Sequence, residues 1–393
     1  MTLPVGMVRC GEATEVSLSG AAVSEPEAAV LGQLLRSCTS VTRLDLSGSR
    51  CSAAALALLG EGLCGGSLPL AELVLSGLVH EAGDESVPLR LHGLVSAACT
   101  STALQLVDVS GQLGTTDGCA LFDGRGEGPL QPLCALMARP GNALRVLRLG
   151  GNGVWPAGAS AALAEALSSS ACVLEELEMN GSALSAAEAV KLVLACGSLQ
   201  KLTLGEMTLP VGMVRCGEAT EVSLSGAAVS EPEAAVLGQL LRSCTSVTRL
   251  DLSGSRCSAA ALALLGEGLC GGSLPLAELV LSGLVHEAGD ESVPLRLHGL
   301  VSAACTSTAL QLVDVSGQLG TTDGCALFDG RGEGPLQPLC ALMARPGNAL
   351  RVLRLGGNGV WPAGASAALA EALSSSACVL EELEMNGSAL SAA

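Results

Sequence analysis

The stretch Leu174-Glu-Glu-Leu177-Glu-Met179-Asn-Gly-Ser182-Ala-Leu184 decides the fold. Its apolar residues alternate with charged ones around Leu177 and Met179, which predicts a short strand with one apolar and one charged face. A run with helical spacing, residues 185–196, follows, and the strand pattern then returns from Leu199 to Leu209. One strand and one helix, repeated, predict a solenoid.

The same short unit recurs along the chain. Within residues 1–206 seven repeat units begin at Ala13, Val41, Leu70, Leu104, Leu144, Leu174 and Leu199. Between strands the apolar spacing becomes helical, and it predicts helices over 25–38, 53–63, 88–99, 129–138, 156–167 and 186–196. Ser24 is the expected N-cap of the first, with Pro26 in its first turn. In the seventh unit, the segment 4–12 after the strand is too short for a full helix.

A longer repeat contains the short ones. Residues 1–187 recur unchanged as 207–393, an offset of 206 positions (207 − 1), and residues 188–206 occur once. We therefore expect one continuous solenoid over 1–393, with a first tandem copy at 1–206 and a second at 207–393 that lacks its last 19 residues. The identity indicates either a recent duplication or an engineered concatemer.

Composition and charge narrow the classes of partner. The chain has 393 residues and a net charge of −18, with 20 basic and 38 acidic residues. Nucleic acid demands a basic footprint, so neither nucleic acid nor an anionic membrane is an expected partner. No apolar window is long enough to predict a transmembrane helix.

The 17 cysteines follow the repeat and include no CxxC pair, which argues against a disulfide scaffold. Several lie at the ends of predicted helices, where buried Cys acts as a small hydrophobic residue. The N-terminus lacks the pattern of a signal peptide. We expect a reducing, cytoplasmic location, with cytoskeletal association as one form of it; a secreted or cell-surface location fits less well.

At LxxLxLxx followed by a helix, the chain resembles the leucine-rich-repeat family, specifically its ribonuclease-inhibitor-like subclass. The resemblance covers nearly the whole chain and implies an α/β solenoid, with a curved parallel β-sheet on the concave side and helices on the convex side. It also implies protein binding through the concave face and edge loops. The chain departs from the family at the asparagine of the turn, where only Asn152 keeps it and the other units carry Ala21, Ser49, Leu78, Gln112, Ser182 and Met207.

Polar residues at alternating strand positions point away from the predicted core and are the candidate protein-binding residues. In the first copy they are Glu15, Arg43, Asp45, Glu72, Asp108, Arg145, Arg148, Glu175, Glu176, Glu178 and Lys201. In the second they are Arg249, Asp251, Glu278, Asp314, Arg351, Arg354, Glu382 and Glu384. The alternative is that these are ordinary solubilising charges, or that Arg145 and Arg148 pair with Glu176 and Glu178 across strands. Two insertions, 81–85 and 114–128, are expected as loops at one edge, and Trp155 and Trp361 are expected to pack at helix starts.

No motif of an enzyme, metal site or phosphate loop occurs, so we expect no catalysis, no cofactor and no metal. The first functional hypothesis is a protein-binding scaffold. The second is a structural or self-assembling array on a periodic or filamentous partner, which the identical copies favour. The third, a regulator of a small GTPase, rests on the family resemblance alone. Neither end carries a polar capping repeat, so self-association through the ends is a further expectation.

Overall fold

The computed structural model describes residues 8, 10–64, 68–80, 91–111, 128, 130–155, 158–270, 274–286, 297–317, 334, 336–361 and 364–389. The chain forms two compact units, the first made of Met1–Leu184 and Lys191–Leu204 and the second of Ser185–Val190 and Gly205–Ala393. Both predicted edge loops, 81–85 and 114–128, fall outside the described residues except for Gly128.

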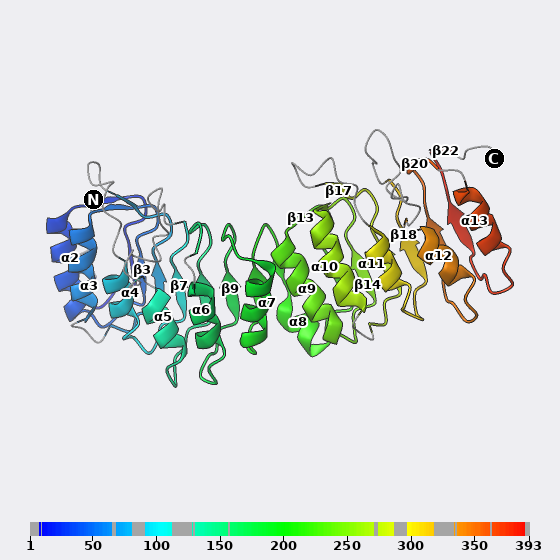
Figure 1. Ribbon diagram of the computed structural model, residues 1–393. Helices are drawn as coiled ribbons and strands as arrows, with labels where there is room; N and C mark the ends of the chain where they lie inside the picture. Colours follow the sequence, from blue (N-terminus) through cyan, green and yellow to red (C-terminus); the bar gives the residue numbers. More distant parts are fainter. Residues whose placement is uncertain are drawn as a thin grey trace. The chain divides into compact units, whose positions relative to one another are not determined.

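Unit 1 contains a parallel sheet with one strand from each repeat, and its strands follow one another in sequence order (Figure 1). They are β1 (Glu15–Ser17), β3 (Arg43–Asp45), β5 (Glu72–Val74), β7 (Leu106–Asp108), β8 (Val146–Arg148), β9 (Glu176–Glu178) and β10 (Lys201–Thr203). A second, smaller parallel sheet follows the turns and contains β2 (Ala22–Val23), β4 (Arg50–Cys51) and β6 (Val79–His80). Consecutive parallel strands joined through helices are the arrangement that the repeat pattern predicts.

The register of the main sheet keeps every repeat in phase. The central residue of each strand lies opposite the central residue of the next, as in Leu44 opposite Leu73 and Leu147 opposite Leu177. These central side chains are at most about 1 % exposed, and they form the core beneath the sheet. The residues on either side of each centre therefore form two parallel rows on the opposite face.

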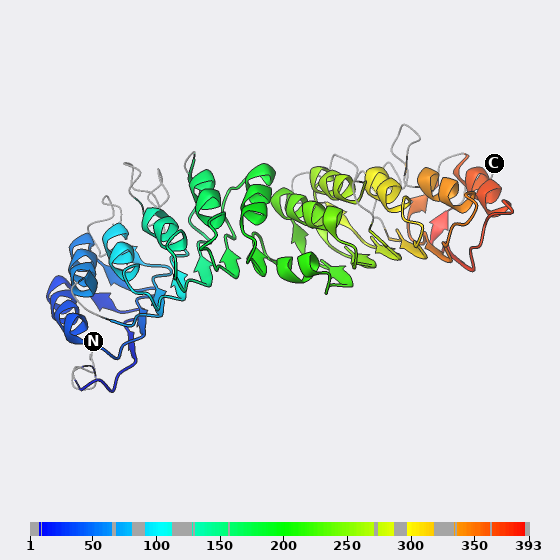
Figure 2. The same cartoon turned by 90° about the horizontal axis from the view of Figure 1, so that it is seen from below.

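The helices of the repeats cover the core side of the strands, as Figure 2 shows for the described elements. They are α2 (Glu25–Ser37), α3 (Ala53–Cys64), α4 (His92–Ala98), α5 (Leu130–Met137), α6 (Ala159–Leu167) and α7 (Ala186–Ala195), the last with residues in both units. Each lies within or one residue beyond a predicted helical range. Ser24 caps α2 as predicted: its amide and hydroxyl donate to the Glu27 carboxylate at 3.0 and 2.7 Å.

Unit 2 repeats this pattern. Its main sheet contains β12 (Glu221–Ser223), β14 (Arg249–Asp251), β16 (Glu278–Val280), β18 (Leu312–Asp314), β19 (Val352–Arg354) and β21 (Glu382–Glu384). The short strands are β11 (Thr208–Leu209), β13 (Ala228–Val229), β15 (Arg256–Cys257), β17 (Val285–His286), β20 (Gly359–Val360) and β22 (Ser388–Ala389). The helices are α8 (Val211–Cys216), α9 (Glu231–Ser243), α10 (Ala259–Cys270), α11 (Leu297–Ala304), α12 (Leu336–Met343) and α13 (Ala365–Leu373). Helix α8 has 6 residues, so the seventh unit carries a short helix, in keeping with the prediction that it has no room for a full one.

The turns after the strands differ in the side chain that hydrogen-bonds their backbone carbonyls. Asn152 donates to the carbonyls of Leu149 and Val109 at 2.7 and 3.0 Å, as the family motif implies. At the equivalent position Ser49 is buried, and its hydroxyl donates to the Leu46 carbonyl at 2.6 Å. Serine therefore replaces one of the two amide hydrogen bonds at this turn.

Helices α2 and α3 pack backbone against backbone because glycine leaves room at their contact. A Cβ built at Gly62 would collide with the Cα and carbonyl oxygen of Gly32. A Cβ at Gly60 would lie 3.2 Å from the backbone of Gly93 on α4. The close spacing of α2, α3 and α4 in unit 1 therefore requires glycine at Gly62 and favours it at Gly60.

The substitution Gly62→Ala should destabilise unit 1 by about 1–3 kcal/mol, because the added methyl forces the backbones of α2 and α3 apart. The matched control is Gly93→Ala, since a Cβ there meets nothing within 4 Å. Alanine at that position should be neutral or stabilising by up to about 1 kcal/mol. Urea unfolding followed by circular dichroism measures both. Equal stability of the two variants would contradict the close helix contact.

Candidate functional site

The strand face is the surface formed by the side chains that flank the central residue of each main strand. Because the register is in phase, the first flanking positions form one row and the second flanking positions form another. The sequence-predicted binding residues all belong to these rows or immediately precede them. The structure therefore brings each copy's candidate residues together on one face.

Arg43 organises the first part of the strand face in unit 1. Its guanidinium pairs with Glu15 on β1 at 3.2 Å, with Asp45 on its own strand at 3.2 Å, and with Glu72 on β5. Burial opposes its charge, but the hydrogen bonds of Glu72 and Asp45 outweigh burial and raise the pKa of Arg43. One cation thus links three neighbouring strands.

Asp45 is held ionised within this cluster. Burial of the carboxyl group favours its neutral form, but hydrogen bonds from Ser47 and Arg43 outweigh burial and place the pKa of Asp45 below its ordinary value. The Ser47 amide donates to this carboxylate at 2.9 Å and so fixes the start of the turn. Asp45 therefore serves the turn and the ion-pair cluster at once.

The last strands of unit 1 carry three further sets of ion pairs. Arg145 pairs with Glu175, and Arg148 lies 3.4 Å from Glu178. Arg148 also lies 3.8 Å from Asp108, whose carboxylate accepts hydrogen bonds from the amide and hydroxyl of Ser110. Lys201 pairs with Glu176 at 2.6 Å. The predicted cross-strand pairing is confirmed for Arg148 with Glu178, whereas Arg145 pairs with Glu175 and Glu176 pairs with Lys201.

Between the two charged clusters the strand face carries four aliphatic side chains beside Asp108. Val74 is buried, while Ala71, Leu106 and Val146 are half-buried. The register places Leu106 opposite Val146, and Val74 opposite Asp108. We call Ala71, Val74, Leu106 and Val146 the apolar centre. The sequence-based prediction named only polar residues and did not include the apolar centre. The stretch Leu104-Gln-Leu106-Val107 does indicate it, because Leu106 is an apolar residue at an outward position.

The strand face of unit 2 has the same plan. Arg249 pairs with Glu221 at 3.1 Å, with Asp251 at 2.9 Å and with Glu278. Arg351 pairs with Glu381, and Arg354 lies 3.4 and 3.5 Å from Glu382 and Glu384. The equivalent apolar centre consists of Ala277, Val280, Leu312 and Val352. Asp314 is buried and accepts from the amide and hydroxyl of Ser316 at 3.0 and 2.6 Å.

Other predicted features lie in the core or outside this face. Trp155 and Trp361 are 8 % and 1 % exposed, which confirms that each packs just before a helix.

Among the described residues, no group of three or more His, Cys, Asp or Glu has an arrangement that could hold a metal ion. Within the same residues, no helix has the length and apolar character needed to cross a membrane.

Comparison with known proteins adds little beyond the fold. No family model and no curated protein matches the chain. Among solved structures, an internalin from Listeria monocytogenes is 13 % identical with a TM-score of 0.33, covering 99 % of this chain and 84 % of its own. TLR13 in complex with the RNA ssRNA13 is 17 % identical with a TM-score of 0.34, covering 91 % of this chain and 40 % of its own. Likenesses this weak carry no argument. The in-register parallel strands and their helices define the chain as an α/β leucine-rich-repeat solenoid, the predicted fold.

Asp45→Asn should lower the stability of unit 1 at neutral pH by about 1 kcal/mol, because the amide cannot accept the charge-assisted hydrogen bonds. Since the folded-state pKa of Asp45 is depressed, its contribution is present above the unfolded pKa and is lost as pH falls through the folded pKa. The difference in the free energy of unfolding between Asp45→Asn and the parent chain should therefore become smaller below about pH 4. Denaturant unfolding at a series of pH values measures this. The control is Glu61→Gln on the exposed surface of α3; a penalty for Asp45→Asn that persists unchanged at low pH would contradict the ionised state.

Proposed function

We propose that this chain is a non-catalytic scaffold that binds protein through the strand face of each copy. The supporting observation is the apolar centre, a half-buried group of aliphatic side chains bordered by ion-paired charges. Protein interfaces combine a dry apolar core with a polar rim in this way. A partner that covers the exposed part of Leu106 gains free energy from burial of its apolar surface.

The charged rim favours one kind of partner. In unit 1 the candidate residues comprise seven carboxylates and four cations, a net charge of −3 (4 − 7). Each cation already pairs with at least one carboxylate, so the rim offers acceptor oxygens rather than spare positive charge. We infer a partner that places an aliphatic or aromatic side chain on the apolar centre and basic groups on the rim. Such charges set specificity and association rate more than affinity.

The tandem copies support the second hypothesis, a structural array on a periodic partner. Residues 1–187 and 207–393 are identical, so the chain presents the same apolar centre and the same Arg cluster twice. We propose that both copies belong to one continuous solenoid, because the repeat spacing continues through residues 188–206. Two identical sites on one chain gain avidity on a partner that repeats.

We further propose a reducing, cytoplasmic location. The described cysteines are free thiols, and Cys38, Cys51, Cys99 and Cys196 are buried as small apolar residues. Burial raises the pKa of Cys99 to about 12, so this thiol stays protonated and unreactive. Cys64, which the sequence grouped with the buried cysteines, is exposed.

The double substitution Leu106→Glu and Leu312→Glu should abolish binding of partners that use the strand face. It places an unpaired carboxylate at the centre of each site, where a partner would have to bury it. Pull-down with the parent chain, this variant and a Val30→Glu control compares which proteins each chain retains. Val30 lies on helix α2 and is 51 % exposed, away from the strand face.

Circular dichroism confirms that every variant is folded. A protein retained by the parent and the Val30→Glu chain but lost from the double leucine variant supports the proposal. Retention by all folded variants would contradict it.

Each single substitution, Leu106→Glu or Leu312→Glu, separates the two hypotheses in the intact chain. For a partner with one site, either single variant should lose no more than about twofold in affinity, because the other copy remains. For a periodic partner, either should lose about 10² to 10⁴-fold, because simultaneous engagement is lost. The three chains are immobilised at low density and the partner from the pull-down is bound from solution; its affinity and dissociation rate on each chain provide the measurement.

A further inference from the structure

Two cysteines from neighbouring repeats meet at the end of unit 1. Cys172 lies before β9 and is half-buried; its carbonyl and the sulfur of Cys196 lie near the same Ser198 hydroxyl, and a hydrogen bond between the two thiols shifts the pKa of each. Cys196 follows directly after α7 and is fully buried. The sequence-based interpretation treated these residues as separate apolar positions and did not predict the contact.

A polar frame holds the two turns together. The Ser198 hydroxyl donates to the Leu174 carbonyl at 2.8 Å and lies 3.5 Å from the Cys172 carbonyl. The sulfur of Cys196 lies 3.5 Å from the same hydroxyl and 3.7 Å from the Leu174 carbonyl. The backbones that carry the two thiols are therefore fixed to each other at several points, independently of the thiols.

The chain contains a natural comparison for this frame. Cys38 stands at the position of Cys196 in an earlier repeat, with its sulfur 3.4 Å from the Ser40 hydroxyl, which donates to the Ala13 carbonyl at 2.8 Å. The residue at the position of Cys172 is there Gly11. The serine frame thus belongs to the repeat, whereas the second thiol is particular to the pair Cys172 and Cys196.

The hydrogen bond makes the two thiols chemically unequal. Donation from Cys172 stabilises the thiolate of Cys196 and lowers the pKa of Cys196; burial opposes this shift, while hydrogen bonds from Ser198 and the Leu199 amide support it. The same hydrogen bond, together with burial, raises the pKa of Cys172. The buried sulfur is therefore the better nucleophile, and the accessible sulfur is the one that a reagent can reach.

We propose that Cys172 and Cys196 form a reversible disulfide between adjacent repeats, with a low-molecular-weight disulfide such as oxidised glutathione as the oxidant. Cys172 attacks one sulfur of the reagent while its proton passes to the Cys196 thiolate. This step forms a mixed disulfide and releases one glutathione as its thiolate; that thiolate then takes the proton from Cys196. The thiolate of Cys196 then attacks the Cys172 sulfur and expels the second glutathione. Two protein thiols are oxidised to one disulfide, and one oxidised glutathione is reduced to two molecules of the thiol.

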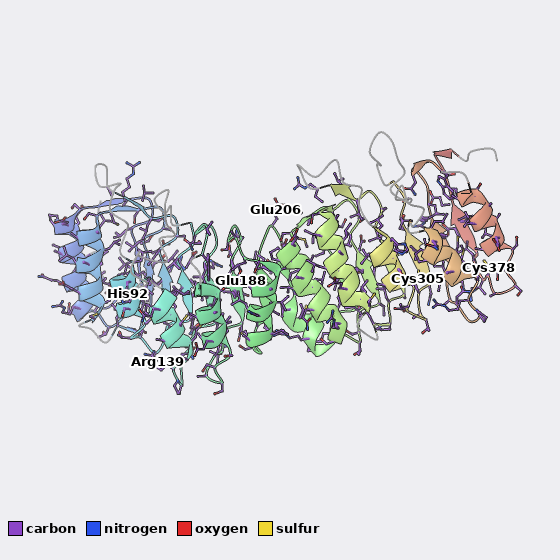
Figure 3. The ribbon with its side chains drawn as sticks, in the orientation of Figure 1. His92, Arg139, Glu188, Glu206, Cys305 and Cys378 are labelled. Atoms are coloured by element: carbon purple, nitrogen blue, oxygen red, sulfur yellow. The ribbon has the colours of Figure 1, made fainter. Side chains whose placement is uncertain are left out.

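The test uses the intact, folded chain equilibrated with graded ratios of reduced to oxidised glutathione, then acid-quenched, alkylated and digested with trypsin. Cys172, Cys196 and Cys378 fall in separate tryptic peptides, 149–191, 192–201 and 355–393, each with one cysteine. Cys378, labelled in Figure 3, occupies the position of Cys172 in the second copy, is half-buried like it, and is the internal control.

We expect the linked peptide 149–191 to 192–201, lighter by two hydrogen atoms than the sum of its parts. The linked peptide should form at a ratio of reduced to oxidised glutathione at least about tenfold higher than the ratio at which Cys378 is modified. In Cys196→Ser the linked peptide should vanish and Cys172 should retain glutathione, because no resolving thiol remains. In Cys172→Ser, which alters the less buried member, neither product should form at this position.

Circular dichroism confirms that each variant is folded, and Cys38→Ser provides a variant whose linked peptide should be unchanged. Equal glutathione modification of Cys172 and Cys378 in the parent chain, with no linked peptide, would overturn the proposal. So would linkage of Cys196 to another cysteine in its place.

Discussion

The in-phase register of parallel strands is the constraint on which the rest of this structure depends. The strands that form the strand face are only three residues long, so a shift of one residue would move the central leucine or valine of each from the core to the surface. Burial of that side chain is worth about 2–3 kcal/mol per repeat, and it selects one register against its neighbours. Once Leu44 lies opposite Leu73, the residues that flank them necessarily form rows across the sheet.

Much of this arrangement could be predicted from the sequence, because spacing alone determines it. The pattern around Leu177 gave the strands, the change to helical spacing gave the helices within a residue or a few at each end, and Ser24 with Glu27 gave a helix start. These features depend on residues close together in the chain. The identical copies were also visible at once, although the sequence does not say how they act together.

The site was predicted less completely, because its properties depend on neighbours about 24 to 40 residues apart in the chain. The charged residues were identified, and so was the pairing of Arg148 with Glu178, but not the pairing of Glu176 with Lys201 on the next strand. The apolar centre was not predicted because the candidate residues were chosen as polar side chains, and Leu106 is an aliphatic residue at an outward position. The contact of Cys172 with Cys196 was not predicted because it requires the turns of two neighbouring repeats to lie against each other, and the sequence alone does not show this.

The ion pairs and the apolar centre have complementary consequences. Arg43 links three carboxylates on three strands, so this cluster stiffens the sheet while keeping a net charge of −2 (1 − 3). Exposed ion pairs contribute little to stability one at a time, although a shared cation adds geometric order. The half-buried aliphatic residues have no such internal partner on the outer face. A partner therefore gains most where the strand face is least polar.

Hydroxyl-radical footprinting of the intact chain tests the central claim most directly, because neighbouring residues on one strand provide their own controls. The account predicts faster oxidation of the half-buried Leu106 and Val146 than of the fully buried Val107 and Leu147. A slip of one residue would reverse this order. Equal or reversed rates at both pairs would contradict the register, and with it the strand face and its apolar centre.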